Sequence, residues 1–191
     1  LWTQERWSHL RYLQVGAGIG LLLLGLHGLV DFNLHIPANA ITFAFLGIIS
    51  ARKGIPWLCK VWQAFHTIFP NSKLLLGGYG AFPENVTVPD GVEIAGFIEP
   101  HQRTAWLQQA DVFVFPSYFE GFAQVIIEAM ACGLPVITTT HTVGPEVIDN
   151  GVEGFVITPG DDNALLDALQ YFMSHPDQIE TMGRAARTRV E

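Results

Sequence analysis

The sequence predicts a parallel, doubly wound α/β sheet over residues 41–191, preceded by a hydrophobic, transmembrane-type helix in a segment of residues 1–40. Three observations predict this. Apolar runs of strand length alternate with amphipathic helical patterns after residue 40. Several of these runs are apolar throughout, as strands buried on both faces of a parallel sheet are. Residues 12–30 carry no formal charge, and a helix of roughly 20 such residues spans a bilayer.

The two parts differ in charge. Residues 1–50 contain two acidic and two basic side chains, so the formal net charge of −8 lies entirely in residues 51–191. An acidic domain lacks the clustered Lys and Arg that a phosphate backbone needs, so we expect no nucleic-acid partner. Cys59 and Cys132 lie inside apolar helical patterns, which indicates core residues rather than a disulfide or a metal site.

The elements of residues 41–191 alternate in order. Apolar runs bounded by turn residues predict strands at 41–47, 73–76, 92–95, 111–115, 136–138 and 154–157. Apolar side chains at helical spacing predict helices at 55–69, 101–110, 121–133, 145–148, 163–173 and 177–190. Residues 41–47 also fit a membrane span, but a sheet without its central first strand would leave neighbouring edges unpaired, so we favour the strand. Asp161 and Asp162 precede a helix, which favours an N-cap over metal ligands.

The strand, loop, helix and strand of residues 111–138 form the central unit. Its helix is predicted to start near Gly121 and to stop at Gly133, with apolar positions at Phe122, Val125, Ile126, Ala129 and Met130. The first turn of such a helix leaves backbone N–H groups free at the strand ends, which suits an anion. Glu120 and Glu128 bracket this anion site and would repel a phosphate that they touched. We therefore expect them to bind hydroxyl groups of the same ligand, which describes a nucleotide sugar.

Residues 116–137, PSYFEGFAQVIIEAMACGLPVI, resemble the donor-binding domain of the retaining group 1 (family 4) glycosyltransferases, which have the Rossmann-like GT-B fold. The resemblance implies that Glu128 holds the ribose and that Glu120 contacts the donor sugar. It also implies that backbone amides from Phe122 to Gln124 hold the pyrophosphate, with Ala123 where many members have Gly. The alternative is that Glu120 caps a helix and Glu128 is solvated.

Residues 45–54, FLGIISARKG, resemble the opening strand and loop of the same family. The resemblance implies that Lys53 contacts the donor phosphates and acts in catalysis with Glu120. Ile48 stands where the family often has Arg, and Arg52 is the candidate replacement. A solvated Lys53 is the alternative. Further positions matching the family's donor cleft are Gly78, Gly121, Phe97 and Ile98, with core packing as the alternative for Phe97.

The resemblance implies transfer of a sugar from a nucleotide-diphosphate sugar to a glycan or lipid-linked acceptor in polysaccharide biosynthesis. Lys53 and the helix amides would stabilise the departing diphosphate, so no metal or other cofactor is expected. The family's fold also has an acceptor domain, which residues 1–50 cannot build. We therefore expect another chain to supply it, and whether this chain alone is an enzyme stays open.

Residues 10–46, including HGLVDFNLHIPANA, resemble the C-terminal membrane tail of the O-antigen ligase and polymerase family. Residues 12–30 are accordingly predicted to cross a membrane, with a buried core helix as the alternative. Basic residues flank the two apolar runs, which places residues 51–191 on the cytoplasmic side of a bacterial inner membrane. A membrane fragment of that family and a folded, non-catalytic fragment remain the alternative functions.

Overall fold

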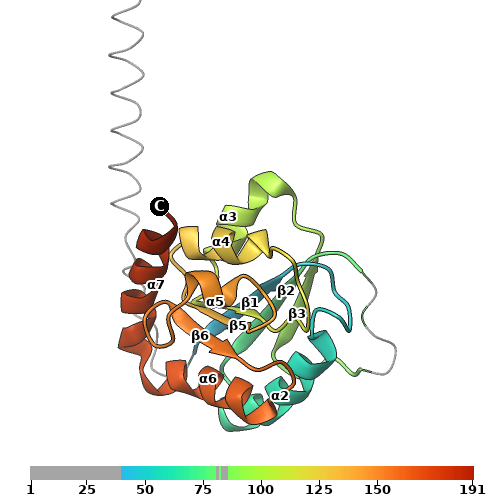
Figure 1. Ribbon diagram of the computed structural model, residues 1–191. Helices are drawn as coiled ribbons and strands as arrows, with labels where there is room; N and C mark the ends of the chain where they lie inside the picture. Colours follow the sequence, from blue (N-terminus) through green and yellow to red (C-terminus); the bar gives the residue numbers. More distant parts are fainter. Residues whose placement is uncertain (1–39, 81, 83–85) are drawn as a thin grey trace, which may run out of the picture. The chain divides into compact units, whose positions relative to one another are not determined.

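The computed structural model describes residues 40–80, 82 and 86–191, so the predicted membrane helix at 12–30 lies outside the described residues. The strands are β1 (Thr42–Leu46), β2 (Lys73–Gly77), β3 (Val92–Gly96), β4 (Val112–Phe115), β5 (Val136–Thr139) and β6 (Gly154–Ile157). The helices are α2 (Ile55–Ile68), α3 (Arg103–Leu107), α4 (Gln124–Ala131), α5 (Gly144–Val147), α6 (Asp162–Ser174) and α7 (Pro176–Val190), and a 3-10 turn (Pro100–Gln102) precedes α3 (Figure 1). The predicted alternation of strands and helices is confirmed.

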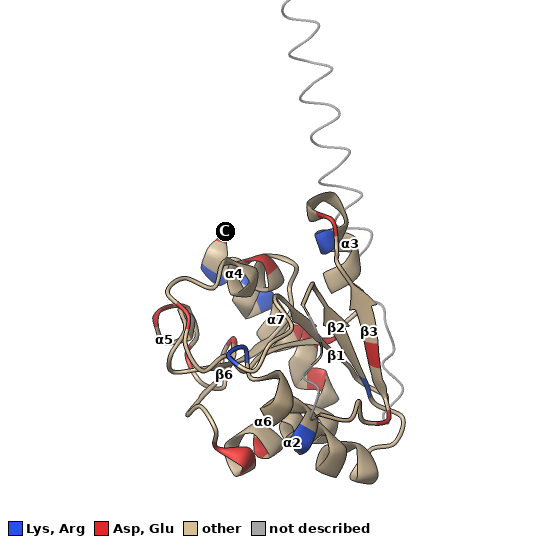
Figure 2. Cartoon of the chain, turned by 90° about the vertical axis from the view of Figure 1, so that its right-hand side faces the viewer, with Lys and Arg blue, Asp and Glu red and all other residues tan. Residues whose placement is uncertain are grey.

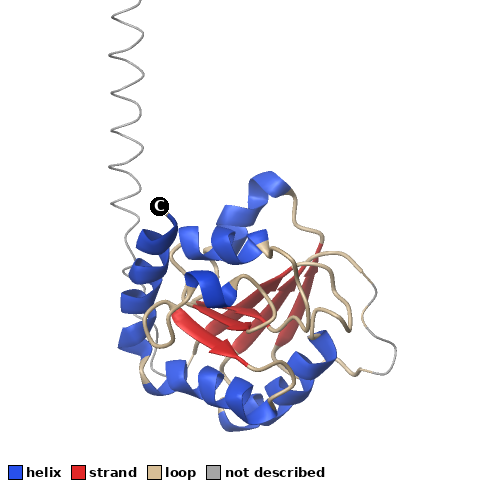
Figure 3. Ribbon diagram, in the orientation of Figure 1, coloured by secondary structure: helices blue, strands red, loops and turns tan. Residues whose placement is uncertain are grey.

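The strands form one parallel sheet in the order β3-β2-β1-β4-β5-β6 (Figure 3). The chain builds outward from β1 to β3, then returns to the other side of β1 and builds outward from β4 to β6. This is the predicted doubly wound topology. The direction of winding reverses between β1 and β4, and in such sheets ligands bind outside the carboxyl ends of the strands at that point.

Strand β1 lies at the centre of the sheet because its side chains are apolar on both faces. Phe43, Ala44 and Phe45 are fully buried. On one face the ring of Phe43 packs edge-on against Trp62 of α2, and Phe45 stacks on Phe115 of β4 with ring centroids 5.5 Å apart. Burying one such ring stabilises the fold by about 2 to 3 kcal/mol. The prediction of a strand at 41–47, rather than a membrane span, is therefore confirmed.

Helices cover both faces of the sheet. Helix α2 packs against α6 on one face, and α4 packs against α7 on the other (Figures 1 and 3). Gly183 permits the second contact, since a Cβ there would lie 2.1 Å from the carbonyl oxygen of Gly133. Asp161 accepts a hydrogen bond from the N–H of Ala164 at 3.0 Å and caps α6, as predicted. Within the described ranges, no helix is long and apolar enough to cross a membrane.

The start of α4 differs from the prediction. The helix begins at Gln124, three residues after Gly121, and Phe122 is 68% exposed instead of lying on the buried face. The preceding loop is tied to the loop after β5, because the N–H of Glu120 donates to the carbonyl of His141 at 2.9 Å. The helix ends near Gly133, whose φ of 80° breaks the helical geometry as expected.

Candidate functional site

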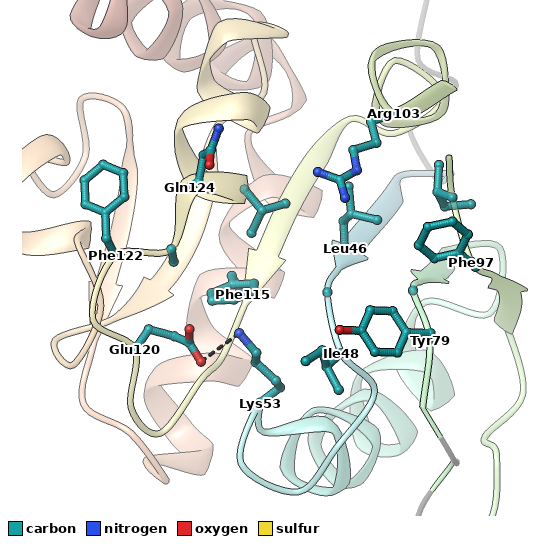
Figure 4. A pocket seen from close by; sticks show the side chains of 15 residues that line it. Leu46, Ile48, Lys53, Tyr79, Phe97, Arg103, Phe115, Glu120, Phe122 and Gln124 are labelled. Carbon is teal, nitrogen blue, oxygen red and sulfur yellow. Dashed lines mark ion pairs between the residues drawn. The ribbon is translucent and has the colours of Figure 1, made fainter. Parts of the chain in front are cut away.

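A pocket of about 250 Å³ lies at the carboxyl ends of the central strands, where the winding of the sheet reverses (Figure 4). Its wall comes from the ends of β1 and β4, the loops after β2 and β3, and the start of α4. The lining residues are Leu46, Gly47, Ile48, Lys53, Gly78, Tyr79, Phe97, Ile98, Arg103, Phe115, Glu120, Phe122, Ala123, Gln124 and Val125. The pocket therefore occupies the position at which a doubly wound sheet binds its ligand.

A buried ion pair forms one end of the pocket. The Nζ of Lys53 lies 2.7 Å from Oε1 of Glu120, and the two side chains are only 10% and 13% exposed. The same Nζ lies 4.9 Å from the ring centroid of Phe115, a cation–π contact (Figure 4). Gly54 makes this approach possible, since its φ is 75° and a Cβ there would lie 2.0 Å from the carbonyl oxygen of Pro116. Lys53 is thus fixed in the pocket rather than solvated.

Glu120 is held by several groups. Its Oε1 accepts a hydrogen bond from the hydroxyl of Ser117 at 3.3 Å and lies 3.3 Å from Nη1 of Arg52. Ser117 is fully buried, and its carbonyl accepts from the hydroxyl of Thr139 at 2.6 Å. Among the described residues, no side chain caps the N-terminus of α4, so the capping alternative for Glu120 is wrong. Long-range contacts therefore set the position of this carboxylate.

Free backbone N–H groups adjoin this ion pair, as the sequence predicts. The N–H of Gln124 is not one of them, because it donates to the carbonyl of Phe122 at 3.0 Å. The N–H groups of Phe122 and Ala123 donate to no other residue in the part of the chain that the structure describes. These two amides and Lys53 can together bind an anion.

A second ion pair lies at the other end of the pocket. Nη1 of Arg103 lies 3.5 Å from Oε1 of Glu128, with side chains 37% and 28% exposed. The Nε of Arg103 and the Oε2 of Glu128 are buried, and neither has a hydrogen-bond partner among the described residues. Glu128 is accordingly paired and partly buried rather than solvated.

Most of the predicted site residues meet in this pocket. Those that line it are Lys53, Glu120, Phe122, Ala123, Gln124, Gly78, Phe97 and Ile98. Glu128, Gly121 and Arg52 lie outside the lining. Arg52 contacts Glu120 with 58% of its side chain exposed, and its role in place of the family's Arg stays a prediction. Phe97 is 53% exposed, which excludes core packing as its role.

The sequence prediction missed Arg103, Tyr79 and Phe115 in the pocket wall. One signal was present for Arg103, which is the only Lys or Arg between Lys73 and Arg184. Basic residues are sparse over the described part of the chain, and acidic residues lie on several elements, including β3 and α6 (Figure 2). A lone cation in an acidic region is a reason to look for a specific partner.

Comparison with known proteins defines the family. Residues 40–175 match the family described as glycosyl transferases group 1, and the chain belongs to that family. The capsular polysaccharide biosynthesis glycosyltransferase CapM of Staphylococcus aureus is 41% identical over 81 residues, which cover 42% of this chain and 21% of that protein. No comparison supports the resemblance of residues 10–46 to the O-antigen ligase and polymerase family, and Thr42–Leu46 at its end form β1.

Solved structures share the fold. Sucrose-phosphate synthase from Thermosynechococcus elongatus has a TM-score of 0.66 and 29% identity, and the match covers 82% of this chain and 42% of that one. The Anabaena protein HepE in complex with UDP-glucose has a TM-score of 0.69 and 22% identity, covering 80% of this chain and 44% of that one. The chain spans between 21% and 28% of the length of the first four curated relatives that it matches.

Proposed function

We propose that residues 41–191 bind the nucleotide-diphosphate sugar of a retaining glycosyl transfer to a glycan or lipid-linked acceptor. The observation that carries the proposal is the buried Lys53–Glu120 pair beside the free amides of Phe122 and Ala123, in a pocket at the reversal of the sheet. Membership of the group 1 family supports it. The binding of UDP-glucose by HepE, which shares the fold, agrees with it.

In this proposal, different residues bind different parts of the donor. Lys53 and the two amides bind the diphosphate, and they stabilise the negative charge that develops on it as its bond to the sugar breaks. Glu120 binds hydroxyl groups of the donor sugar through Oε2, because Oε1 is already engaged by Lys53. Glu128 binds the ribose hydroxyls. Gly78, Phe97 and Ile98 form the wall beside the base.

We propose that a further segment or chain binds the acceptor, and that transfer needs no cofactor beyond the donor. We also propose that residues 12–30 anchor the protein in a bacterial inner membrane with residues 51–191 in the cytoplasm. The support is the uncharged length of this segment and its basic flanks. We expect the chain to resist carbonate extraction from membranes. Deletion of residues 12–30 should abolish this resistance.

Thermal unfolding with added nucleotides tests the donor proposal. UDP, GDP, ADP and their common sugar conjugates are each added to the chain. A ligand that binds only the folded state at a hundred times its dissociation constant stabilises it by about 2.7 kcal/mol. We expect one base to raise the melting temperature, and Glu128→Ala to abolish the rise. The matched control is Glu180→Ala, which removes a glutamate paired with Arg184 on the surface of α7. No shift with any nucleotide would contradict the proposal.

A further inference from the structure

We infer that Arg103 is a positioning residue for Glu128, and that the pair presents one hydrogen-bond acceptor and one donor to a hydroxyl-bearing ligand, the ribose of the donor. The inference rests on the proposed function and goes beyond it, because it assigns Arg103 a role in selecting a ribonucleotide.

Arg103 connects the pocket to Glu128. Among the residues that the structure describes, Arg103 and Lys53 are the two cations in the pocket lining, and Glu128 is absent from that lining. Arg103 extends from α3 into the pocket from the side opposite to Lys53 (Figure 4). It also contacts Glu128 of α4. A ligand in the pocket that reaches Glu128 must therefore meet Arg103 as well.

The pairing leaves one atom of each partner unused. Only Nη1 of Arg103 and Oε1 of Glu128 make the contact, at 3.5 Å. The Nε of Arg103 and the Oε2 of Glu128 are both shielded from solvent, with no hydrogen-bond partner within the described residues. A buried donor or acceptor without a partner is unfavourable and uncommon. This arrangement favours a ligand that satisfies both atoms.

A hydroxyl group has the required chemistry, because it donates one hydrogen bond and accepts others. It can donate to Oε2 of Glu128 and accept from the Nε–H of Arg103. A phosphate oxygen fits less well here, since the carboxylate of Glu128 would repel it. At the Lys53 end, the ammonium of Lys53 and the free amides of Phe122 and Ala123 offer several donors to a phosphate. The two ends thus separate the diphosphate from the hydroxyl groups.

The contact also limits the carboxylate in space. A charge-assisted hydrogen bond from a guanidinium restricts where the bonded carboxylate oxygen can lie. With Oε1 held by Arg103, Oε2 keeps one direction for the ligand. Without Arg103, the side chain of Glu128, which is 28% exposed, turns toward water and loses that direction. The preference for a ribonucleotide over its 2′,3′-dideoxy form then decreases.

Calorimetric binding of matched nucleotides tests this. The chain is titrated with the diphosphate among UDP, GDP and ADP that stabilises it most, and with the 2′,3′-dideoxy form of the same nucleotide. We expect the unaltered chain to prefer the ribonucleotide. Arg103→Gln is expected to reduce that preference about tenfold, the effect of losing one charge-assisted hydrogen bond. The affinity for the dideoxy form is expected to change far less. Arg103→Lys restores part of the preference.

The controls separate the possible failures. Arg184→Gln removes an exposed arginine of the same kind on α7 and leaves the preference unchanged. If Arg103→Gln weakens both nucleotides equally, or neither, Arg103 does not position Glu128. If the unaltered chain binds without a preference for ribose, Glu128 does not read the ribose and the inference is wrong. If no nucleotide binds, the proposed function fails first. Far-UV circular dichroism checks folding, and Arg103→Lys carries the test if Arg103→Gln is unfolded.

Discussion

The two ends of the pocket contain the same kind of contact, a cation paired with a glutamate, built in different ways. Lys53 and Glu120 lie 2.7 Å apart with side chains at most 13% exposed, and Glu120 has further contacts with Ser117 and Arg52. Arg103 and Glu128 lie 3.5 Å apart, are more exposed and leave two polar atoms unpaired. The first pair already has its partners within the fold. The second is incomplete until a ligand adds its own groups.

This difference predicts different costs of substitution at the two ends. A buried pair contributes little net stability but is costly to break, because one charge then stays buried alone. A partly exposed pair contributes little and is inexpensive to break. Substitutions at the Lys53 end are therefore expected to change the free energy of unfolding most, whereas substitutions at the Arg103 end change ligand selection.

Loss of the buried carboxylate is expected to have the largest effect. Glu120→Ala leaves the ammonium of Lys53 buried without its closest partner, and should lower the free energy of unfolding by about 3 kcal/mol. Urea denaturation measures it. The double variant Lys53→Met, Glu120→Leu removes both charges and should recover most of the loss. A cost below about 1 kcal/mol for Glu120→Ala would show that the pair is solvated and that the contrast between the ends is wrong.

Loss of the buried hydroxyl is expected to have an intermediate effect. Ser117→Ala removes a hydrogen bond to Glu120 inside the fold, and should lower the free energy of unfolding by about 1 kcal/mol. The control is Thr181→Ala. It removes a hydroxyl that donates a hydrogen bond to the carbonyl of Asp177 on the exposed surface of α7. Equal urea midpoints for the two variants would mean that Ser117 does not help to hold the carboxylate.

Loss of the partly exposed Arg103 is expected to have the smallest effect on stability. Arg103→Gln should change the free energy of unfolding by less than about 1 kcal/mol, because Glu128 can turn to water. Its main effect should be a reduced preference for the ribonucleotide over the dideoxy form. A loss of stability as large as that of Glu120→Ala would make both ends structural and remove the distinction between them.

The sequence predicts the sheet well because its strands are buried on both faces. Runs such as Val112–Phe115 are apolar throughout, which is typical of parallel strands covered by helices on both faces. The turn residues between them mark the ends of the elements. The family motif then brings Lys53, Glu120 and the helix amides to one edge of the sheet. These features depend on local pattern, which a sequence displays directly.

Features that depend on distant contacts were predicted less well. The start of α4 is displaced because the loop before it is bonded to His141 of another loop and to the Lys53 side chain. Arg103 contacts Glu128 across 25 positions of sequence, and no periodicity relates them. The same holds for Ser117, whose neighbours come from the loop after β1 and from β5. Only the folded chain brings these groups together.

The most direct test of the central claim is to locate the diphosphate by nuclear magnetic resonance. The nucleoside diphosphate that stabilises the chain most is added to the ¹⁵N-labelled chain, and the shifts of the backbone amides are followed. The account predicts the largest changes at Phe122 and Ala123 and in the loop of residues 47–53. It predicts their loss in Lys53→Met but not in Lys60→Met, which removes an exposed ammonium paired with Asp162. If saturating nucleotide shifts other amides instead, or leaves the amides of Phe122 and Ala123 unchanged, the account is contradicted.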